Sequence, residues 1–154
     1  MLQLVQPNSP EQWLEARRLV QEYAASLDFD LCFQGFEREL QNLETEYGHP
    51  DGYFALAAWD RAFVGCGGLR RFSSWECEMK RVYVAPSHRG RGIGQGLTVA
   101  LISHARRLGY KSMLLDTLSS MTAAQRIYFA LGFTPTEPYR ANPVPGATFL
   151  KLQL

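Results

Sequence analysis

The spacing of hydrophobic and polar residues predicts a helical beginning to the chain. Leu2 to Val5 alternates weakly and predicts a short strand. The segment Asn8 to Glu11 places a polar cap before a proline and an acidic residue, which is a helix-start signal. We expect that helix to run to Ser26, and a second helix to cover residues 36–43.

The middle of the chain predicts antiparallel strands. Tyr53 to Trp59 and Ala62 to Arg70 are apolar runs joined by a tight turn at Asp60-Arg61, which predicts a hairpin. Glu76 to Ala85 predicts a third strand, which Pro86 ends.

Strands and helices alternate in the last third of the chain. We expect a helix from Leu97 to Leu108, a short buried strand at 112–115, a helix over 121–131, a proline-rich loop and a final strand at 148–152. Glycines close both helices, as is common at helix C-termini. This order predicts a mixed α/β (α+β) sheet in a single domain covering 1–154.

Composition narrows the function classes. The chain has 154 residues, and its net charge is only +1, with 16 basic and 15 acidic residues. That balance argues against a nucleic-acid partner. We find no secretory signal and no apolar run of about 20 residues that would span a membrane. Cys32, Cys66 and Cys77 lack metal-ligand spacing, so we expect reduced thiols and a cytoplasmic protein without a metal.

A glycine-rich segment between a strand and a helix is the strongest functional signal. It contains Arg89, Gly90, Arg91, Gly92, Ile93, Gly94, Gln95 and Gly96. Glycines let the backbone approach a phosphate, and the free N–H groups of a helix start point toward it. No Gly-Lys-Ser/Thr follows, and the third glycine of the dinucleotide motif is missing. A turn without a ligand is the competing interpretation.

Two motifs together resemble the GNAT family of acetyl-CoA-dependent N-acetyltransferases. The first is Arg-x-x-Gly-x-Gly at 89–94, and the second is the segment from Ala124 through Tyr128 to Gly132-Phe133. The similarity spans roughly Glu78 to Phe133. It implies a mostly antiparallel central sheet flanked by helices, and acetyl-CoA as co-substrate. It also implies direct transfer to a primary amine of a small molecule or peptide, and homodimers are common in the family. A non-catalytic acyl-CoA sensor is the alternative.

The resemblance also suggests catalytic roles. Tyr128 matches the tyrosine that protonates the leaving thiolate in many relatives, and Glu78 matches a strand glutamate that acts as base. Glu76 or water could take that role instead, and Glu78 could simply pair with Lys80 or Arg81. No histidine is placed locally to activate Cys77, which disfavours an acyl-enzyme.

The resemblance places the cofactor arm and the acceptor less firmly. It implies that the pantetheine arm lies along the backbone of Val82, Tyr83 and Val84, although their side chains could simply be core. Met121 replaces an asparagine that contacts the cofactor in many relatives. For the acceptor, the candidates are Phe33, Gln34, Arg140 and Asn142. Asp116 is a further candidate, either for holding a cationic acceptor or for capping the next helix.

Overall fold

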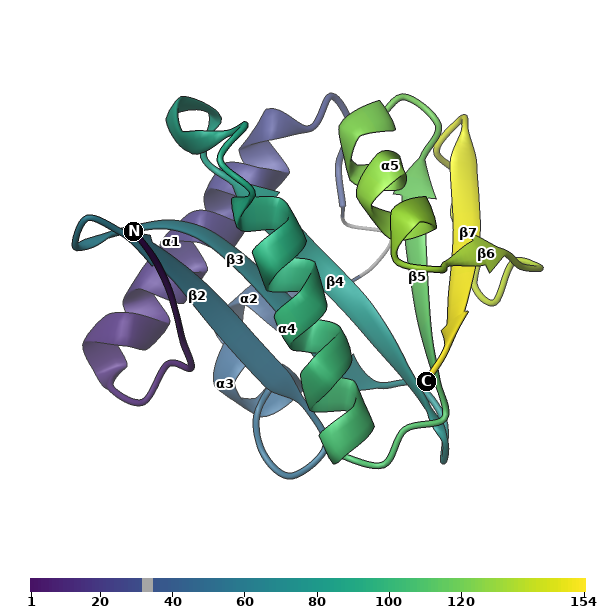
Figure 1. Ribbon diagram of the computed structural model, residues 1–154, viewed down its shortest axis with the longest axis horizontal. Coiled ribbons are helices and arrows are strands. Elements are labelled where there is room, and N and C mark those ends of the chain that lie inside the picture. The colour runs from purple at the N-terminus through teal and green to yellow at the C-terminus, as the bar shows by residue number, and fades with distance from the viewer. Residues whose placement is uncertain (32–34) are drawn as a thin grey trace.

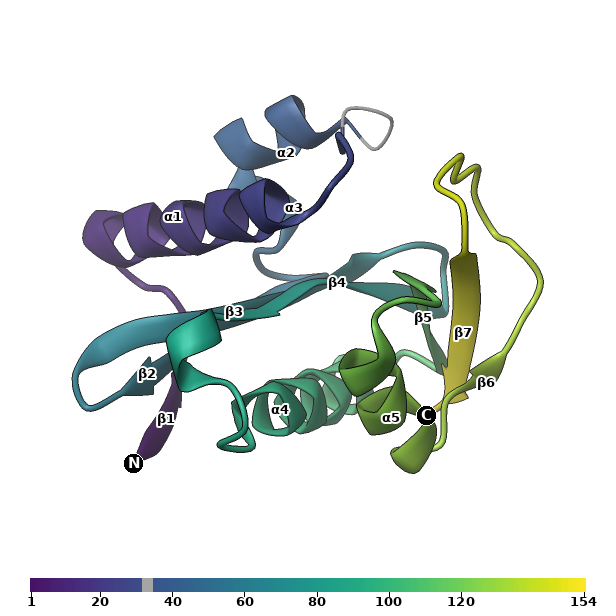
Figure 2. The same ribbon diagram turned by 90° about the horizontal axis from the view of Figure 1, so that it is seen from above.

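The fold is a seven-stranded sheet between two layers of helices (Figures 1 and 2). The structure, a computed structural model, describes residues 1–31 and 35–154. The acceptor candidates Phe33 and Gln34 lie outside the described residues. In the sheet the strands follow the order β1-β2-β3-β4-β5-β7-β6.

All neighbouring strands but one pair are antiparallel. The strands are β1 (Leu2–Val5), β2 (Tyr53–Trp59), β3 (Ala62–Arg71), β4 (Glu76–Val84), β5 (Ser112–Leu118), β6 (Thr134–Pro135) and β7 (Ala147–Gln153). Only β4 and β5 run parallel. The predicted mixed, mostly antiparallel sheet and its hairpin are therefore confirmed.

The helices divide between the two faces of the sheet. They are α1 (Pro10–Ser26), α2 (Phe36–Gln41), α3 (Leu43–Glu46), a short 3₁₀ helix (Pro86–His88), α4 (Ile93–Arg107) and α5 (Thr122–Ala130). Figure 2 shows α1, α2 and α3 on one face and α4 and α5 on the other. Ser9 caps α1 by accepting a hydrogen bond from the backbone N–H of Gln12 at 3.2 Å, as the sequence predicts. No helix in residues 1–31 and 35–154 is long and apolar enough to cross a membrane.

Three of the predicted helices and strands differ from the structure by more than one residue at a boundary. The predicted helix at 36–43 breaks at Asn42, whose backbone angles are not helical, into α2 and α3. Helix α4 begins at Ile93, not at Leu97, because the glycines that signal a loop also form its first turn. Strand β5 continues to Leu118, beyond the apolar run, because β7 pairs with it along its whole length.

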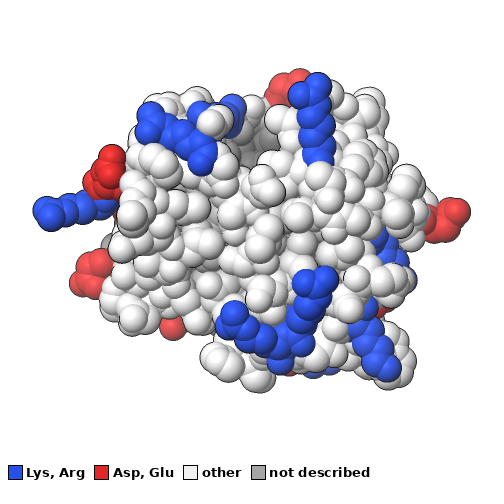
Figure 3. All heavy atoms as spheres, in the orientation of Figure 1, with Lys and Arg blue, Asp and Glu red and all other residues white. Residues whose placement is uncertain are grey.

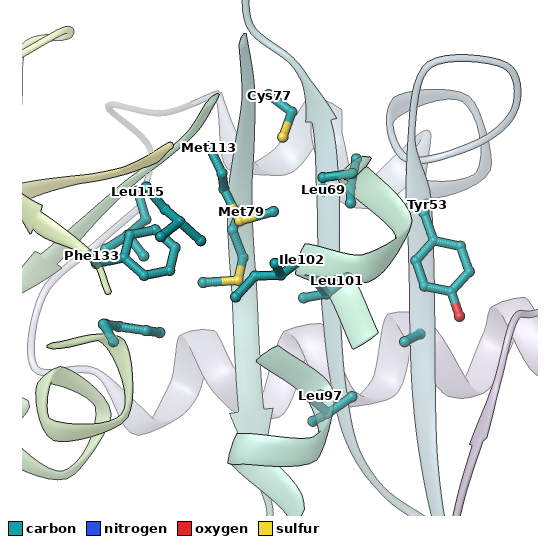
Figure 4. Close-up of a cluster of buried hydrophobic side chains, with 14 of the residues drawn as sticks. Tyr53, Leu69, Cys77, Met79, Leu97, Leu101, Ile102, Met113, Leu115 and Phe133 are labelled. Atoms are coloured by element: carbon teal, nitrogen blue, oxygen red, sulfur yellow. The ribbon is translucent and has the colours of Figure 1, made fainter. Parts of the chain in front are cut away.

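Each face of the sheet carries its own hydrophobic core. The core under α4 and α5 is drawn in Figure 4, where Leu101 and Ile102 of α4 lie beside Met79 of β4. The core under α1, α2 and α3 includes Phe54 and further buried residues of β2 and β3. A buried, well-packed core on both faces holds the central strands in one position.

A bulge in β4 changes which face its side chains occupy. The register with β3 shifts between Cys66 and Gly68, and Arg81 has a positive φ of 63°. Met79 before the bulge faces the α4 core, and so does Val82 after it. Without the extra residue, the alternation of a strand would place Val82 on the opposite face.

Candidate active site

The strands β4 and β5 separate after a short parallel contact, and a cavity lies in the opening. They pair only from Glu76 to Glu78 and from Ser112 to Leu114. The cavity has a volume of about 80 Å³. Its lining comes from β4, β5, α1, α5 and three loops, and consists of Tyr23, Phe29, Leu31, Met79, Lys80, Arg81, Val82, Leu115, Asp116, Thr117, Leu118, Met121, Ala124, Tyr128 and Asn142.

The glycine-rich segment forms the start of α4, close to this opening. Gly90 and Gly92 have φ values of +79° and +78°, the left-handed region that favours glycine. The N–H of Gly96 donates to the carbonyl of Gly92 at 3.0 Å. The N–H groups of residues 93–95 come before that bond, in the helix turn whose donors have no partner inside the helix. This is the geometry of a phosphate site.

The two arginines of the segment lie against aromatic rings. Arg89 donates from Nε to the carbonyl of Val84 at 3.0 Å, and its guanidinium lies 5.9 Å from the Tyr83 ring. Arg91 lies 5.2 Å from the ring of Trp59. Figure 3 shows a hollow between the start of α4 and α5, with basic side chains over both elements. An anion at the helix start would therefore meet positive charge as well as N–H donors.

Tyr128 of α5 reaches the cavity from the α4 side of the sheet. Its side chain is buried and packs edge-on against Phe133, with ring centroids 5.7 Å apart. Burial raises the pKa of Tyr128 above its ordinary value of about 10. The hydroxyl is therefore protonated at neutral pH, which a general acid requires.

Glu78 lies in a network of ions behind the cavity. Its carboxylate accepts hydrogen bonds from the Tyr139 hydroxyl at 2.7 Å and from the Arg140 guanidinium at 2.6 Å. Lys80 Nζ lies 3.8 Å and Arg70 Nε 3.5 Å from its oxygens. The side chain is only 1% exposed and is not part of the cavity lining. These contacts make Glu78 a counter-ion, and its role as base stays a prediction.

Glu76, the reserve base, is also paired. Its carboxylate lies 3.2 Å from Lys151 Nζ and accepts a hydrogen bond from the Ser112 hydroxyl at 3.2 Å. Cys77 is buried, and burial raises the pKa of its thiol to about 12. A thiol that stays protonated is a poor nucleophile, which agrees with the absence of an acyl-enzyme role.

The loop between β6 and β7 closes one side of the site. Arg140 binds Glu78, as described, while Asn142 Nδ2 donates to Asp116 Oδ2 at 3.1 Å. Asn142 and Asp116 line the cavity, whereas Arg140 does not. Met121 also lines the cavity, and its sulfur accepts a hydrogen bond from the Thr117 hydroxyl at 3.7 Å.

Sequence reasoning treated Lys80 and Arg81 only as pairing partners of Glu78. In the structure both line the cavity. Arg81 pairs instead with Glu39 of α2, through two hydrogen bonds of 2.8 and 2.9 Å. The tandem Lys80-Arg81 in an otherwise buried strand was the signal that could have revealed them, since buried cations need a specific reason.

Comparison with known proteins identifies the family. The sequence profile of the Acetyltransferase (GNAT) family matches residues 12–133. The chain belongs to this family. An uncharacterized N-acetyltransferase of Schizosaccharomyces pombe is 38% identical over 147 residues, covering 94% of this chain and 90% of that protein. An L-methionine sulfoximine/L-methionine sulfone acetyltransferase of Salmonella typhimurium is 34% identical over 117 residues, covering 73% of this chain and 63% of that protein.

Solved GNAT structures share the whole fold. A GNAT acetyltransferase of Staphylococcus aureus superposes with a TM-score of 0.79 at 20% identity, covering 99% of both chains. An acetyltransferase of Salmonella typhimurium, solved with acetyl-CoA, gives a TM-score of 0.72 at 20% identity, covering 99% of this chain and 94% of that one. Membership of the GNAT family, shown by the sequence profile and by the relatives named as N-acetyltransferases, makes this chain an acyltransferase with acetyl-CoA as co-substrate.

The residues of this GNAT enzyme fit acetyl-CoA. The start of α4 suits the pyrophosphate, and the opening between β4 and β5 would admit the pantetheine arm beside Val82. Tyr83 and Val84 follow on the same strand, with the Tyr83 side chain in the α1 core and Val84 against the α4 core. No cluster of His, Cys, Asp and Glu suited to a metal occurs in the part of the chain that the structure describes.

The glycine at position 94 provides a clean test of the pyrophosphate site. A Cβ there would meet only Ile127 at 3.6 Å and Val84 at 3.8 Å, which are ordinary contacts. We expect Gly94→Val to weaken acetyl-CoA binding at least tenfold, about 1.4 kcal/mol, because its side chain would occupy space in front of the donors. Isothermal calorimetry measures the affinity, and circular dichroism verifies the fold.

Gly96→Ala is the matched control, because its Cβ meets the end of the Leu2 side chain at 3.0 Å, not the phosphate loop. Gly92 is a poorer probe, since its positive φ would add backbone strain to any substitution. Equal acetyl-CoA affinity in Gly94→Val and the parent would rule out this pyrophosphate site.

Proposed function

We propose that the enzyme transfers the acetyl group of acetyl-CoA directly to a primary amine of a small molecule or peptide. The observation that carries this proposal is the cavity between β4 and β5. It brings Tyr128 from one face of the sheet together with Asp116 and Asn142 from the other. An acid for the thiolate and a carboxylate for a cationic acceptor therefore border one space.

The chemistry follows from these groups. An alkylammonium has an ordinary pKa of about 10.4, so its nitrogen must lose a proton before it can attack a thioester. Asp116 would attract and orient the ammonium, and Asn142 fixes that carboxylate by a hydrogen bond. Tyr128 would protonate the departing thiolate, whose ordinary pKa is about 8.5. Direct transfer needs no nucleophilic side chain, in keeping with the buried, protonated thiol of Cys77.

The relatives suggest which amines to try first. The Salmonella typhimurium relative is named for L-methionine sulfoximine and L-methionine sulfone, both small amines that also carry a carboxylate. A small cavity with Asp116 in its lining suits a small acceptor that carries a cationic amine. We therefore propose these two compounds as the first probes, followed by simple alkylamines and short peptides.

The test is release of free thiol from acetyl-CoA in the presence of each amine. We expect at least one amine of the panel to raise the rate above the amine-free background, with the acetylated product confirmed by mass spectrometry. Acetyl-CoA binding without turnover on any amine would contradict the proposal. It would favour the alternative of a non-catalytic acyl-CoA sensor.

A further inference from the structure

We propose that Lys80 is the group that accepts the proton of the acceptor amine, with Glu78 as its counter-ion. This inference rests on the proposed function. It assigns the base to a side chain that lines the cavity, in place of the glutamate that lies behind it.

The lining of the cavity leaves few groups for this step. Among the described residues, its titratable side chains are Tyr23, Lys80, Arg81, Asp116 and Tyr128. Burial raises the pKa of Tyr23, as it does that of Tyr128, so both hydroxyls are protonated and neither can take the proton of the amine. Arg81 is held by Glu39, and an arginine does not deprotonate in proteins. Lys80 and Asp116 remain.

Position and chemistry separate the two. Lys80 and Asp116 approach the cavity from opposite strands, β4 and β5, where the strands have parted. A carboxylate is a much weaker base than an amine, so it is better suited to hold an ammonium than to remove its proton. We therefore assign to Asp116 the binding of the acceptor ammonium and to Lys80 the removal of its proton.

The surroundings of Lys80 favour its neutral form. The residue is 5% exposed, and this burial is the largest influence on it, lowering its pKa to about 8. Arg81 and Arg140 also lower the pKa, while Glu78 and Asp116 raise it. A base whose pKa lies near the working pH combines a free lone pair with useful basicity.

The ion network then explains why Glu78 is buried. Its carboxylate lies 3.8 Å from Lys80 Nζ and is held in place by hydrogen bonds from Tyr139 and Arg140. When Lys80 takes a proton, its new charge forms beside this carboxylate, which offsets part of the cost of burying an ammonium. Glu78 is thus a positioning residue, whose removal affects the reaction through Lys80.

The reaction balances with these groups. The acceptor ammonium first passes one proton to the lone pair of Lys80 Nζ, and the neutral nitrogen then uses its own lone pair to form a bond to the thioester carbon. The carbon–sulfur bond breaks, and the thiolate takes the proton of the Tyr128 hydroxyl. The products are an N-acetylated amine and coenzyme A. The acceptor nitrogen gives its second proton to the Tyr128 phenolate, directly or through solvent, and Lys80 releases its proton to solvent.

The decisive variant is Lys80→Arg, which keeps the positive charge but has no lone pair to offer at any working pH. With L-methionine sulfone, or the amine of the panel that turns over fastest, we expect kcat to fall by about 10²–10⁴-fold. Acetyl-CoA affinity by calorimetry should not change. Lys80→Met, an unbranched side chain of similar length, should show a comparable loss. Lys111→Arg, at a lysine that does not line the cavity, is the matched control and should behave as the parent.

The pH dependence of kcat distinguishes a base from a purely structural role of Lys80, because a structural role would leave the midpoint of the profile unchanged. In the parent, kcat should rise with pH through a midpoint near 8, and in both Lys80 variants that midpoint should disappear. Glu78→Gln should shift the midpoint downward, because it removes a negative charge that favours the protonated lysine. A Lys80→Arg variant within twofold of the parent would overturn the proposal. If kcat of Lys80→Arg equals that of the parent while kcat of Asp116→Asn is strongly reduced, the base is Asp116 and not Lys80.

A measurement independent of turnover separates this proposal from the proposed function. The chain has only three lysines, Lys80, Lys111 and Lys151, so ¹³Cε-lysine NMR spectra can be assigned with single Lys→Arg variants. We expect the Lys80 signal to titrate with a midpoint near 8, and a midpoint near 10.4 would overturn the role. Parent enzyme that acetylates no amine would instead contradict the proposed function, and the proton-transfer role with it.

Discussion

Tyr128→Phe is expected to lower kcat by about 10²–10⁴-fold while acetyl-CoA affinity stays at the parent value. The substitution removes only a hydroxyl from a buried ring that packs against Phe133, so the fold has no reason to change. Without the hydroxyl, the coenzyme A thiolate must leave without a proton donor. Steady-state kinetics with the best amine of the panel measure kcat, and calorimetry measures the affinity for acetyl-CoA.

Tyr110→Phe is the control for this variant. Tyr110 is also a buried tyrosine, but its hydroxyl donates to the carbonyl of Asp51 at 2.6 Å and the residue does not line the cavity. Its loss should cost about 0.5–1.5 kcal/mol of stability and leave kcat unchanged. If Tyr128→Phe keeps kcat within twofold of the parent, Tyr128 is not the acid.

Arg81→Met is expected to destabilise the protein by about 3–5 kcal/mol, because it removes the bidentate partner of the buried Glu39 carboxylate and leaves it only the Tyr47 hydroxyl at 2.9 Å and Arg70 at 3.6 Å. The pair is bidentate, with 2.8 and 2.9 Å hydrogen bonds, and both side chains are 2% exposed. At about 2–4 °C per kcal/mol for a chain of this size, the melting temperature should fall by about 6–20 °C. Thermal unfolding followed by circular dichroism measures the change.

The exposed pair of Arg18 and Glu22 is the matched control. Its side chains are 44% and 40% exposed, so Arg18→Met should change the melting temperature far less. The double variant Arg81→Met with Glu39→Met should recover part of the loss, since no buried charge is then left alone. A melting temperature of Arg81→Met equal to that of Arg18→Met would contradict this account.

The loss of stability at acidic pH also tests the ion pair of Arg81 and Glu39. Burial raises the pKa of Glu39, but the hydrogen bond and charge of Arg81, together with the charge of Arg70 and the hydrogen bond from Tyr47, hold the pKa below its usual value. The stabilisation is therefore fully present above the unfolded pKa and is lost as the pH falls through the lowered folded pKa. Arg81→Met should accordingly lose most stability at neutral pH and approach the parent in acid.

The same ion pair matters for the site. Arg81 is the bulge residue of β4 with φ of 63°, and its guanidinium ties the bulge to α2. The bulge decides that Val82 faces the α4 core while Lys80 and Arg81 border the cavity. A non-glycine residue in the left-handed region needs such surrounding support, because the conformation itself is strained.

Local sequence determined most of the secondary structure and the glycine-rich loop at the start of α4. Alternation and turn residues predicted the hairpin at Asp60-Arg61, and the caps predicted α1. The loop was readable because its physics is local: glycines, a helix start and two arginines all lie within 89–96. The same holds for Tyr128, which a short motif places on a helix of nine residues.

Tertiary structure decided what surrounds the reacting groups. Glu78 meets Tyr139 and Arg140, residues about sixty positions away, and Arg81 meets Glu39 across the sheet. These partners exist only because β7 brings its loop beside β5 and because α2 covers β4. No local pattern encodes such contacts, since a strand shows which side chains share a face but not what packs against that face. The bulge adds to this, because one extra residue exchanges the two faces for everything that follows it.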